Sequence, residues 1–176
     1  YRGMTIAEAA QLRGETPEET IVNLIIEDES RIQCIYFSMS EENVRKKIML
    51  PWVSFDSDAG SYSDISKDFI THPRAFGSFA RVLGKYVREE KLISMEEAIR
   101  RLSGFPSDNL GIKNRGYLKV GYYADIVVFD PTTIQDKATF EDPLQFAEGV
   151  EHVFVNGVQV LSLSLIHISE PTRLNP

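Results

Sequence analysis

The feature of this sequence that most constrains its fold is an apolar run, a helical pattern and a second apolar run in immediate succession. Residues 33–37 and 51–55 read as short strands, and Ser40 is placed to cap a helix that continues to about Met49. A β-α-β unit joins two parallel strands by a right-handed crossover. The sequence therefore predicts an α/β fold in which the residues after Phe55 lie at the sheet edge that carries the chemistry of such folds.

Further helices are predicted on both sides of this unit. Two short helices, 5–13 and 17–29, are separated by Gly14. A long amphipathic helix is expected from Pro73 to about Glu90. A capping box of Ser94 and Glu97 then begins a helix that Gly104 should end. We interpret the apolar stripes of these last two helices as core; they are Phe76, Phe79, Leu83, Tyr86 and Val87 in the first and Met95, Ala98, Ile99 and Leu102 in the second.

The character of the chain changes to β after Gly111. Residues 124–129 form an apolar run that Asp130-Pro131 ends, and two alternating runs flank Asn156-Gly157, which is the strongest short signal for a hairpin. We therefore divide the chain into an α/β part, residues 1–111, and a small β part, residues 112–161.

The tail is treated separately. The sequence from Leu163 to Arg173 resembles the translation of a sequencing adaptor, so we interpret residues 162–176 as adaptor-derived rather than as a native terminal strand. His167 is accordingly not a ligand candidate.

Composition excludes several classes of function. The net charge of −7 and the lack of a basic cluster argue against a nucleic-acid surface, so a small-molecule substrate is favoured. The single cysteine, Cys34, excludes an internal disulfide framework, and no apolar run is long enough to cross a membrane. We expect a cytoplasmic protein, although a signal peptide upstream of Tyr1 stays open.

The residues that could support chemistry begin with the carboxylates after residues 51–55. Asp58 at such a strand end could take a proton from metal-bound water. The alternative is that Asp56 and Asp58 only cap the following turn. The three histidines and Cys34 include no His-x-His pair, so we expect no tight metal site within this chain.

A second group is Thr71-His72-Pro73-Arg74, just before the long helix. Arg74 could form a bidentate pair with a substrate carboxylate, or it could be an ordinary surface arginine. His72 could bind substrate or cap the turn.

Taken together, five ordered motifs resemble the N-acyl-D-amino-acid deacylase branch of the amidohydrolase superfamily. They are Phe37-Ser-Met-Ser-Glu-Glu-Asn-Val44, Pro51-Trp-Val-Ser-x-x-Ser-Asp-Ala59, Thr71-His-Pro-Arg-x-x-Gly77, Gly121-x-x-Ala-Asp-Ile-Val-Val-Phe-Asp-Pro131 and Val153-Phe-Val-Asn-Gly-Val158. The resemblance covers residues 1 to about 161. One departure is Asp56, where such sequences usually have a small residue; an exposed Asp56 would be inert, whereas a buried one would raise the pKa of Asp58.

The resemblance implies a fold and a set of roles. The chain would be the C-terminal part of a (β/α)8 barrel, with residues 33–37 as strand seven and 51–55 as strand eight, followed by strands of a small β-sandwich. Asp58 would be the general acid/base and at most a weak metal ligand. Arg74 would bind the substrate carboxylate, with His72 beside it. The zinc ligands would lie upstream, and Cys34 is not one of them.

The implied activity is metal-dependent hydrolysis of the amide bond of N-acyl-D-amino acids. One alternative is a cyclic amidohydrolase of the dihydroorotase or hydantoinase type. Another is an inert fragment, and we expect this chain to be inactive without the missing ligands. Exposed strand edges and apolar surface would also make it poorly soluble alone.

Overall fold

The computed structural model describes residues 1, 3–29, 32–60 and 71–162. The proposed adaptor-derived tail, with His167, lies outside the described residues apart from Ser162. The chain divides into two compact units, residues 1–38 and 39–176, and each is described by itself.

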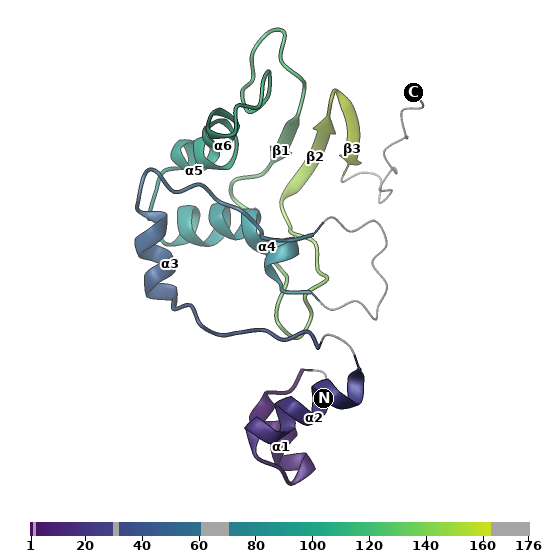
Figure 1. Cartoon of the computed structure of the whole chain (residues 1–176). Helices are drawn as coiled ribbons and strands as arrows, with labels where there is room; N and C mark the ends of the chain where they lie inside the picture. The colour runs from purple at the N-terminus through teal and green to yellow at the C-terminus, as the bar shows by residue number, and fades with distance from the viewer. Residues whose placement is uncertain (2, 30–31, 61–70, 163–176) are drawn as a thin grey trace. The chain divides into compact units, whose positions relative to one another are not determined.

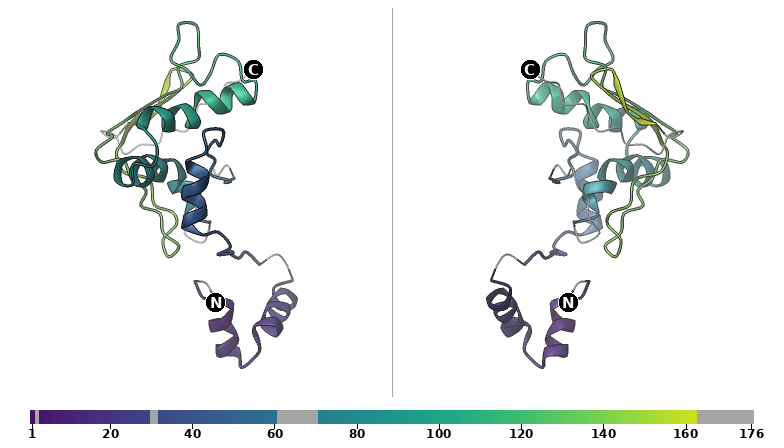
Figure 2. Two further views of the ribbon diagram at one scale, coloured as in Figure 1. Left: turned by 90° about the vertical axis from the view of Figure 1, so that its left-hand side faces the viewer. Right: turned by 90° about the vertical axis from the view of Figure 1, so that its right-hand side faces the viewer.

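The first unit is built on a pair of helices, α1 (Ile6–Arg13) and α2 (Pro17–Asp28), which pack against each other (Figures 1 and 2). Thr5 and Thr16 cap them, each through a reciprocal pair of hydrogen bonds with the glutamate three residues later. The chain turns between the helices at Gly14. Both predicted helices and the break between them are confirmed.

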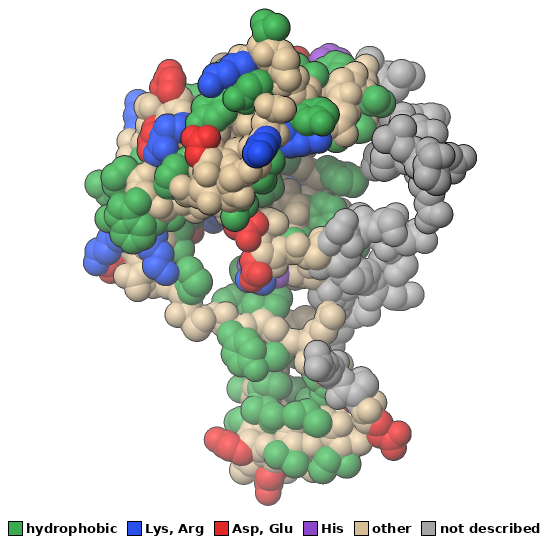
Figure 3. All heavy atoms as spheres, turned by 45° about the horizontal axis from the view of Figure 1, so that its top comes forward, with side chains coloured by type: hydrophobic (Ala, Val, Ile, Leu, Met, Phe, Trp, Pro, Cys, Tyr) green, Lys and Arg blue, Asp and Glu red, His purple; other side chains and the backbone are tan. Residues whose placement is uncertain are grey.

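Much of the apolar surface of α2 stays exposed. Hydrophobic side chains are visible at the surface of both units in Figure 3, and on α2 they are Ile21, Val22, Ile25 and Ile26. Two short helices have too little area to bury every apolar face. The buried apolar side chains of this unit are the small Ala9 and Ala10 of α1.

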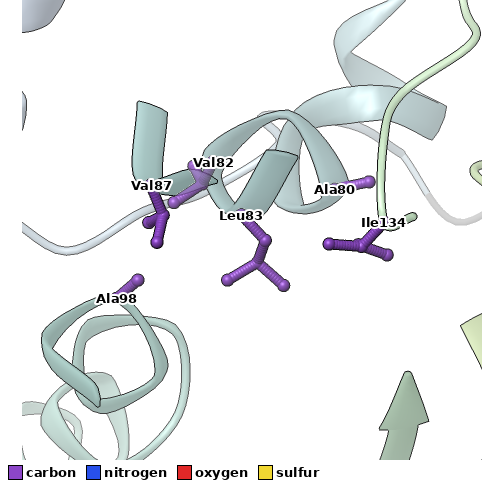
Figure 4. Packing of buried hydrophobic residues seen from close by; sticks show 6 residues of the cluster. All are labelled: Ala80, Val82, Leu83, Val87, Ala98 and Ile134. Atoms are coloured by element: carbon purple, nitrogen blue, oxygen red, sulfur yellow. The ribbon is translucent and has the colours of Figure 1, made fainter. Parts of the chain in front are cut away.

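The second unit carries the larger core. Its helices are α3 (Glu41–Ile48), α4 (Arg74–Arg81), η1 (Val82–Glu89), α5 (Met95–Leu102) and α6 (Gly104–Asn109). The core forms where η1 packs on α5 and on the backbone after the first strand (Figure 4); its buried members are Ala80, Val82, Leu83, Val87, Ala98 and Ile134. The predicted stripes are therefore core for Leu83, Tyr86, Val87 and Ala98, whereas Phe79 and Ile99 remain exposed.

The predicted long helix is continuous but changes its hydrogen-bonding pattern. Residues Arg74–Arg81 are α-helical, and Val82–Glu89 form a π-helix, which ends with Glu90 N donating to Lys85 O at 2.8 Å. The wider turn accompanies a close backbone approach at Gly84, where a Cβ atom would lie 2.6 Å from Ile134 O. Apolar spacing alone did not distinguish the two helix types.

The helix predicted at 94–104 begins as expected and ends differently. Ser94 Oγ accepts a hydrogen bond from Glu97 N at 3.2 Å, which confirms half of the capping box. The Glu97 carboxylate binds Arg100 instead of the Ser94 backbone. Gly104 does not stop the helical region but begins α6. Tyr117 packs against this position so closely that a side chain there would clash.

The two strands predicted at 33–37 and 51–55 are not formed. Helix α3 between them is present and begins after Ser40, as predicted. Neither flanking segment is a strand, and within the described ranges the only sheet contains three other strands. A parallel strand needs partners supplied by distant parts of the chain, so an apolar run without such partners has no ladder to join.

The β region forms as predicted. Strands β1 (Ile126–Phe129), β2 (Val150–Val155) and β3 (Val158–Ser162) make an antiparallel sheet in the order β1-β2-β3 (Figure 1). Asn156 and Gly157 turn the chain between β2 and β3 with φ of 51° and 80°, the positive values that a tight hairpin turn requires.

Candidate functional site

The structure brings the two predicted charged residues into direct contact. Arg74 Nη2 lies 2.6 Å from Asp58 Oδ2 and also donates to the backbone oxygen of Asp58 at 3.2 Å. Arg74 is the first residue of α4, and Asp58 has a left-handed backbone with φ of 48°. The Asp58 side chain is 78% exposed and that of Arg74 46%, so solvent or a ligand can reach both groups.

His72 lies at the start of the same helix. Its Nδ1 accepts a hydrogen bond from Arg74 N at 3.0 Å, which is the contact expected of a residue that caps the turn. Partial burial, together with the charge of Arg74, lowers the pKa of His72 from its ordinary value of 6.5. This shift favours the neutral ring, which is the form in which Nδ1 can accept a hydrogen bond.

Asp56 is separate from this pair. It is exposed, and its Oδ1 accepts a hydrogen bond from Ser57 N at 2.7 Å. The local turn-capping interpretation thus describes Asp56, whereas Asp58 is paired with Arg74. Asp56 thus occupies the exposed position in which we expect it to be inert.

Two aromatic residues that sequence reasoning missed lie beside the site. Phe140 meets the His72 ring edge-on at a centroid distance of 5.2 Å, and Phe146 meets Phe76 of α4 in the same way at 5.6 Å. Both come from the loop between β1 and β2, far along the chain. No local pattern in the sequence indicates these contacts.

The helix that begins with Arg74 is anchored to α3 by charge. Glu41 Oε1 accepts a hydrogen bond from Lys85 Nζ at 2.5 Å, and Oε2 accepts one from Tyr86 OH at 3.0 Å. Burial favours the protonated form of Glu41, but hydrogen bonds from Lys85, Tyr86 and Arg81 outweigh it and lower its pKa from 4.5 to about 2.

A zinc ion does not fit the described residues alone. Among residues 1, 3–29, 32–60 and 71–162, no group of three or more His, Cys, Asp or Glu side chains is placed to hold a metal ion. Asp58 has Arg74 as its partner rather than a second ligand. Any zinc site that used Asp58 would need ligands from elsewhere.

The described part of the chain also has no helix that is both long and apolar enough to span a bilayer.

Comparison with known proteins gives the context of this geometry. The N-acyl-D-glutamate deacylase of Alcaligenes xylosoxydans xylosoxydans is 42% identical over 126 residues, which are 72% of this chain and 25% of that protein. The D-aminoacylase of the same organism is 36% identical over 158 residues, 90% of this chain and 31% of that protein.

A similar structure is that of N-acyl-D-glutamate deacylase from Bordetella bronchiseptica, solved with zinc and a phosphonate inhibitor that mimics the tetrahedral intermediate. The TM-score is 0.78 at 34% identity, and the match covers 90% of this chain and 31% of that one. This chain thus spans between a quarter and a third of the length of these relatives.

The family model that matches this sequence is that of the amidohydrolase family, and the match extends over residues 4–161. It includes Asp58, Arg74 and His72 as well as all of the three-stranded sheet except Ser162. The chain therefore belongs to the amidohydrolase family.

Proposed function

We propose that the complete protein to which this chain belongs hydrolyses the amide bond of N-acyl-D-amino acids. The observation that carries the proposal is the contact between Asp58 and Arg74, a proton-transferring carboxylate beside a carboxylate-binding cation. An N-acyl amino acid presents an amide and an α-carboxylate close together, so it needs both kinds of group. The similarity to D-aminoacylase and to N-acyl-D-glutamate deacylase supports the same substrate class.

The three residues have different tasks in this proposal. Asp58 accepts a proton from the attacking water and later returns it to the leaving amine. Arg74 binds the α-carboxylate of the substrate. An exposed ion pair contributes only about 0–1 kcal/mol, so a substrate carboxylate can displace Asp58 from Arg74 and leave it free for proton transfer. His72 holds the first turn of α4 and borders the substrate.

We propose zinc as the cofactor of the complete protein. When bound, zinc supplies an activated water at neutral pH. Its ligands would come from outside the described residues, which do not form a metal site by themselves. This chain alone is accordingly proposed to be inactive.

The architecture of the complete protein follows from the same proposal. Residues 1–111 would be the C-terminal portion of a (β/α)8 barrel, and residues 112–161 would be strands of a β-sandwich. The antiparallel sheet among the described residues lies wholly after residue 112, which supports this division.

The role of Asp58 is tested by Asp58→Asn in the complete enzyme. Loss of the base should lower kcat by about 10²–10⁴-fold on N-acetyl-D-glutamate or N-acetyl-D-methionine. Asp56→Asn is a matched control, because it removes a neighbouring carboxylate that only bonds Ser57 N, and it should leave kcat unchanged. Full activity of the Asp58 variant would remove this residue from the mechanism.

The role of Arg74 is tested by Arg74→Ala. Loss of the carboxylate partner should raise KM by about 10- to 100-fold with a smaller change in kcat, because the contact is made in both ground and transition states. The control is a substrate whose α-carboxylate is replaced by an amide, for which the variant and the wild type should have similar KM. An unchanged KM for the carboxylated substrate would rule out this role.

Assays of the same enzyme with other substrates distinguish the two alternative functions from the proposed one. A cyclic amidohydrolase would open dihydroorotate or a hydantoin and leave linear N-acyl-D-amino acids intact. An inert protein would do neither, even with zinc supplied.

A further inference from the structure

Residues 48–55 lead to Asp58 and are held by side chains instead of by a sheet. Arg101 Nη1 donates to Leu50 O at 2.5 Å and to Val53 O at 3.1 Å, and Arg101 Nη2 donates to Ile48 O at 2.5 Å. The Phe55 ring faces the same guanidinium, with its centroid 4.8 Å from Cζ. One side chain of α5 therefore contacts the last residue of α3 and three points along the residues after it, which form no strand.

A neighbouring arginine adds a fifth point. Arg100 Nη2 donates to Pro51 O at 3.0 Å while its Nε binds Glu97 at 2.8 Å. Arg100 lies at the surface, with 41% of its side chain exposed. Its contact with the segment is thus the weaker of the two.

Arg101 is entirely buried, at 0% exposure, and it is the largest fully buried side chain among the described residues. Burial lowers its pKa from the ordinary value, yet an arginine in a protein stays charged. A buried charge is costly unless it is well bonded. Here the three carbonyl oxygens accept hydrogen bonds from Nη1 and Nη2 and offset part of that cost. Nε forms no hydrogen bond with the described residues but lies 3.4 Å from Glu97 Oε1, with which it makes an ion pair.

We propose that Arg101 is a positioning residue for catalysis, which fixes the path of residues 48–55 and thereby the place of the Asp58 carboxylate. The proposal rests on the function proposed above, in that Asp58 transfers the proton. Phe55, the last residue that Arg101 contacts, lies three residues before Asp58. Arg74 binds the Asp58 carboxylate directly. The contacts that Arg101 and Arg74 make do not involve a neighbouring strand.

The geometry also explains the residue type. A planar guanidinium can donate in several fixed directions. Here Nη1 donates to two of the carbonyl groups and Nη2 donates to the third. A lysine would keep the charge but offer a single ammonium group on a flexible stem. Arg101→Lys should therefore loosen the segment without removing the buried charge.

The first experiment uses the chain itself. Trp52 is the only tryptophan of the sequence, lies within the segment and is 68% exposed. Its time-resolved fluorescence anisotropy should show more fast depolarisation in Arg101→Lys, and a smaller change in the same direction in Arg100→Gln. The matched control is Arg88→Lys, since Arg88 Nη1 also binds a carbonyl, Ile134 O, at 2.5 Å but away from the segment. The control should leave Trp52 unchanged.

The second experiment uses the complete enzyme. Misplacement of a catalytic group by about 1 Å can cost about 10²-fold, so Arg101→Lys should lower kcat by about 10- to 100-fold while KM stays close to wild type. Arg101→Met should lower kcat further, so that lysine gives partial rescue. Arg88→Lys should retain kcat.

The outcomes separate this inference from the proposed function. Unchanged Trp52 anisotropy, or a kcat equal to wild type in folded Arg101→Lys, would overturn the positioning role. Looser Trp52 with a lower kcat and unchanged KM would establish it. A complete wild-type enzyme without deacylase activity would overturn the proposed function and the catalytic half of this inference, while Trp52 would still decide whether Arg101 holds the segment.

Discussion

The region around residues 32–60 and the region 124–162 both have strand-like sequences, yet only the second forms a sheet. In the second region β2 meets β3 immediately across Asn156-Gly157, and β1 pairs with β2 across residues 130–149, so every strand finds its partner within the region. The described residues supply no strand that pairs with 33–37 or 51–55, and parallel neighbours would have to be brought in by crossover connections. The comparison teaches that a β propensity becomes a strand only where the chain also supplies its neighbour.

The two regions also satisfy their backbone groups differently. In the sheet, β2 is paired on both sides, with β1 and with β3. In the segment before Asp58, the carbonyl oxygens of Leu50 and Val53 are bound by Arg101. A buried backbone group needs a hydrogen-bond partner whichever structure provides it, and here a side chain takes the place of a strand.

The largest expected effect is a slowing of amide exchange when residues 33–37 and 51–55 gain the strand partners of the complete protein. In the complete protein, amide hydrogen exchange at residues 33–37 and 51–55 should slow by roughly 10³-fold or more relative to this chain, because stable pairing suppresses local opening. Exchange at 126–129 and 150–155 should change far less, since those strands already have partners. Mass spectrometry of matched peptides from the two proteins makes the measurement. Equally fast exchange at 51–55 in both would show that this segment is not a barrel strand.

A smaller effect, on the stability of the β region, is expected from removing the Asp125 interactions that hold the β2–β3 turn. Asp125 Oδ1 accepts a hydrogen bond from Asn156 N at 2.8 Å, and Oδ2 pairs with Arg115. Asp125→Ala should therefore destabilise the β region by about 2 kcal/mol, the usual cost of losing charge-assisted hydrogen bonds. Urea unfolding followed by the β-sheet circular dichroism signal measures the change.

The control for this prediction is Asp125→Asn. It keeps the acceptor for Asn156 N and loses only the charge, so its cost should be about half or less. If both variants cost the same, the ion pair with Arg115 carries the effect and the hydrogen bond to the turn does not.

The smallest effect concerns α3, which is well formed although neither flanking segment is a strand. The pKa of Glu41 is lowered to about 2 when folded, so its stabilisation is complete above about pH 4.5 and is lost as pH falls toward 2. Because Glu41 is partly exposed, the contribution should be on the order of 1 kcal/mol. Glu41→Gln should be less stable than wild type at pH 7, with the difference shrinking below pH 4.5. A difference in urea midpoint that stays constant with pH would contradict this assignment.

Local signals made much of the fold predictable. Ser40, Thr16 and Ser94 begin helices where the sequence places them, because a cap acts on amides only two or three residues away. The Asn156-Gly157 turn is equally local. The burial of Arg101 was not predictable, since it depends on carbonyl groups about fifty residues earlier.

In the candidate site, short motifs single out residues but do not give the contacts between them. Asp58, Arg74 and His72 come from short motifs, but the ion pair of Asp58 with Arg74 and the edge contact of His72 with Phe140 join segments that the sequence separates. Neither contact has a periodic or adjacent pattern.

The π-helix η1 has a consequence for how this sequence can change by insertion or deletion. Each residue of an α-helix advances about 100° around the axis, and the wider turns of a π-helix hold extra residues within the same path. Deleting one residue between Val82 and Glu89 could therefore return the turn to α geometry while keeping the entry and exit directions. The cost would fall on the close passage of Gly84 past Ile134. Length variants of this protein are thus expected to tolerate a change here better than in α5, where a shift would move Arg101 off its three carbonyl groups.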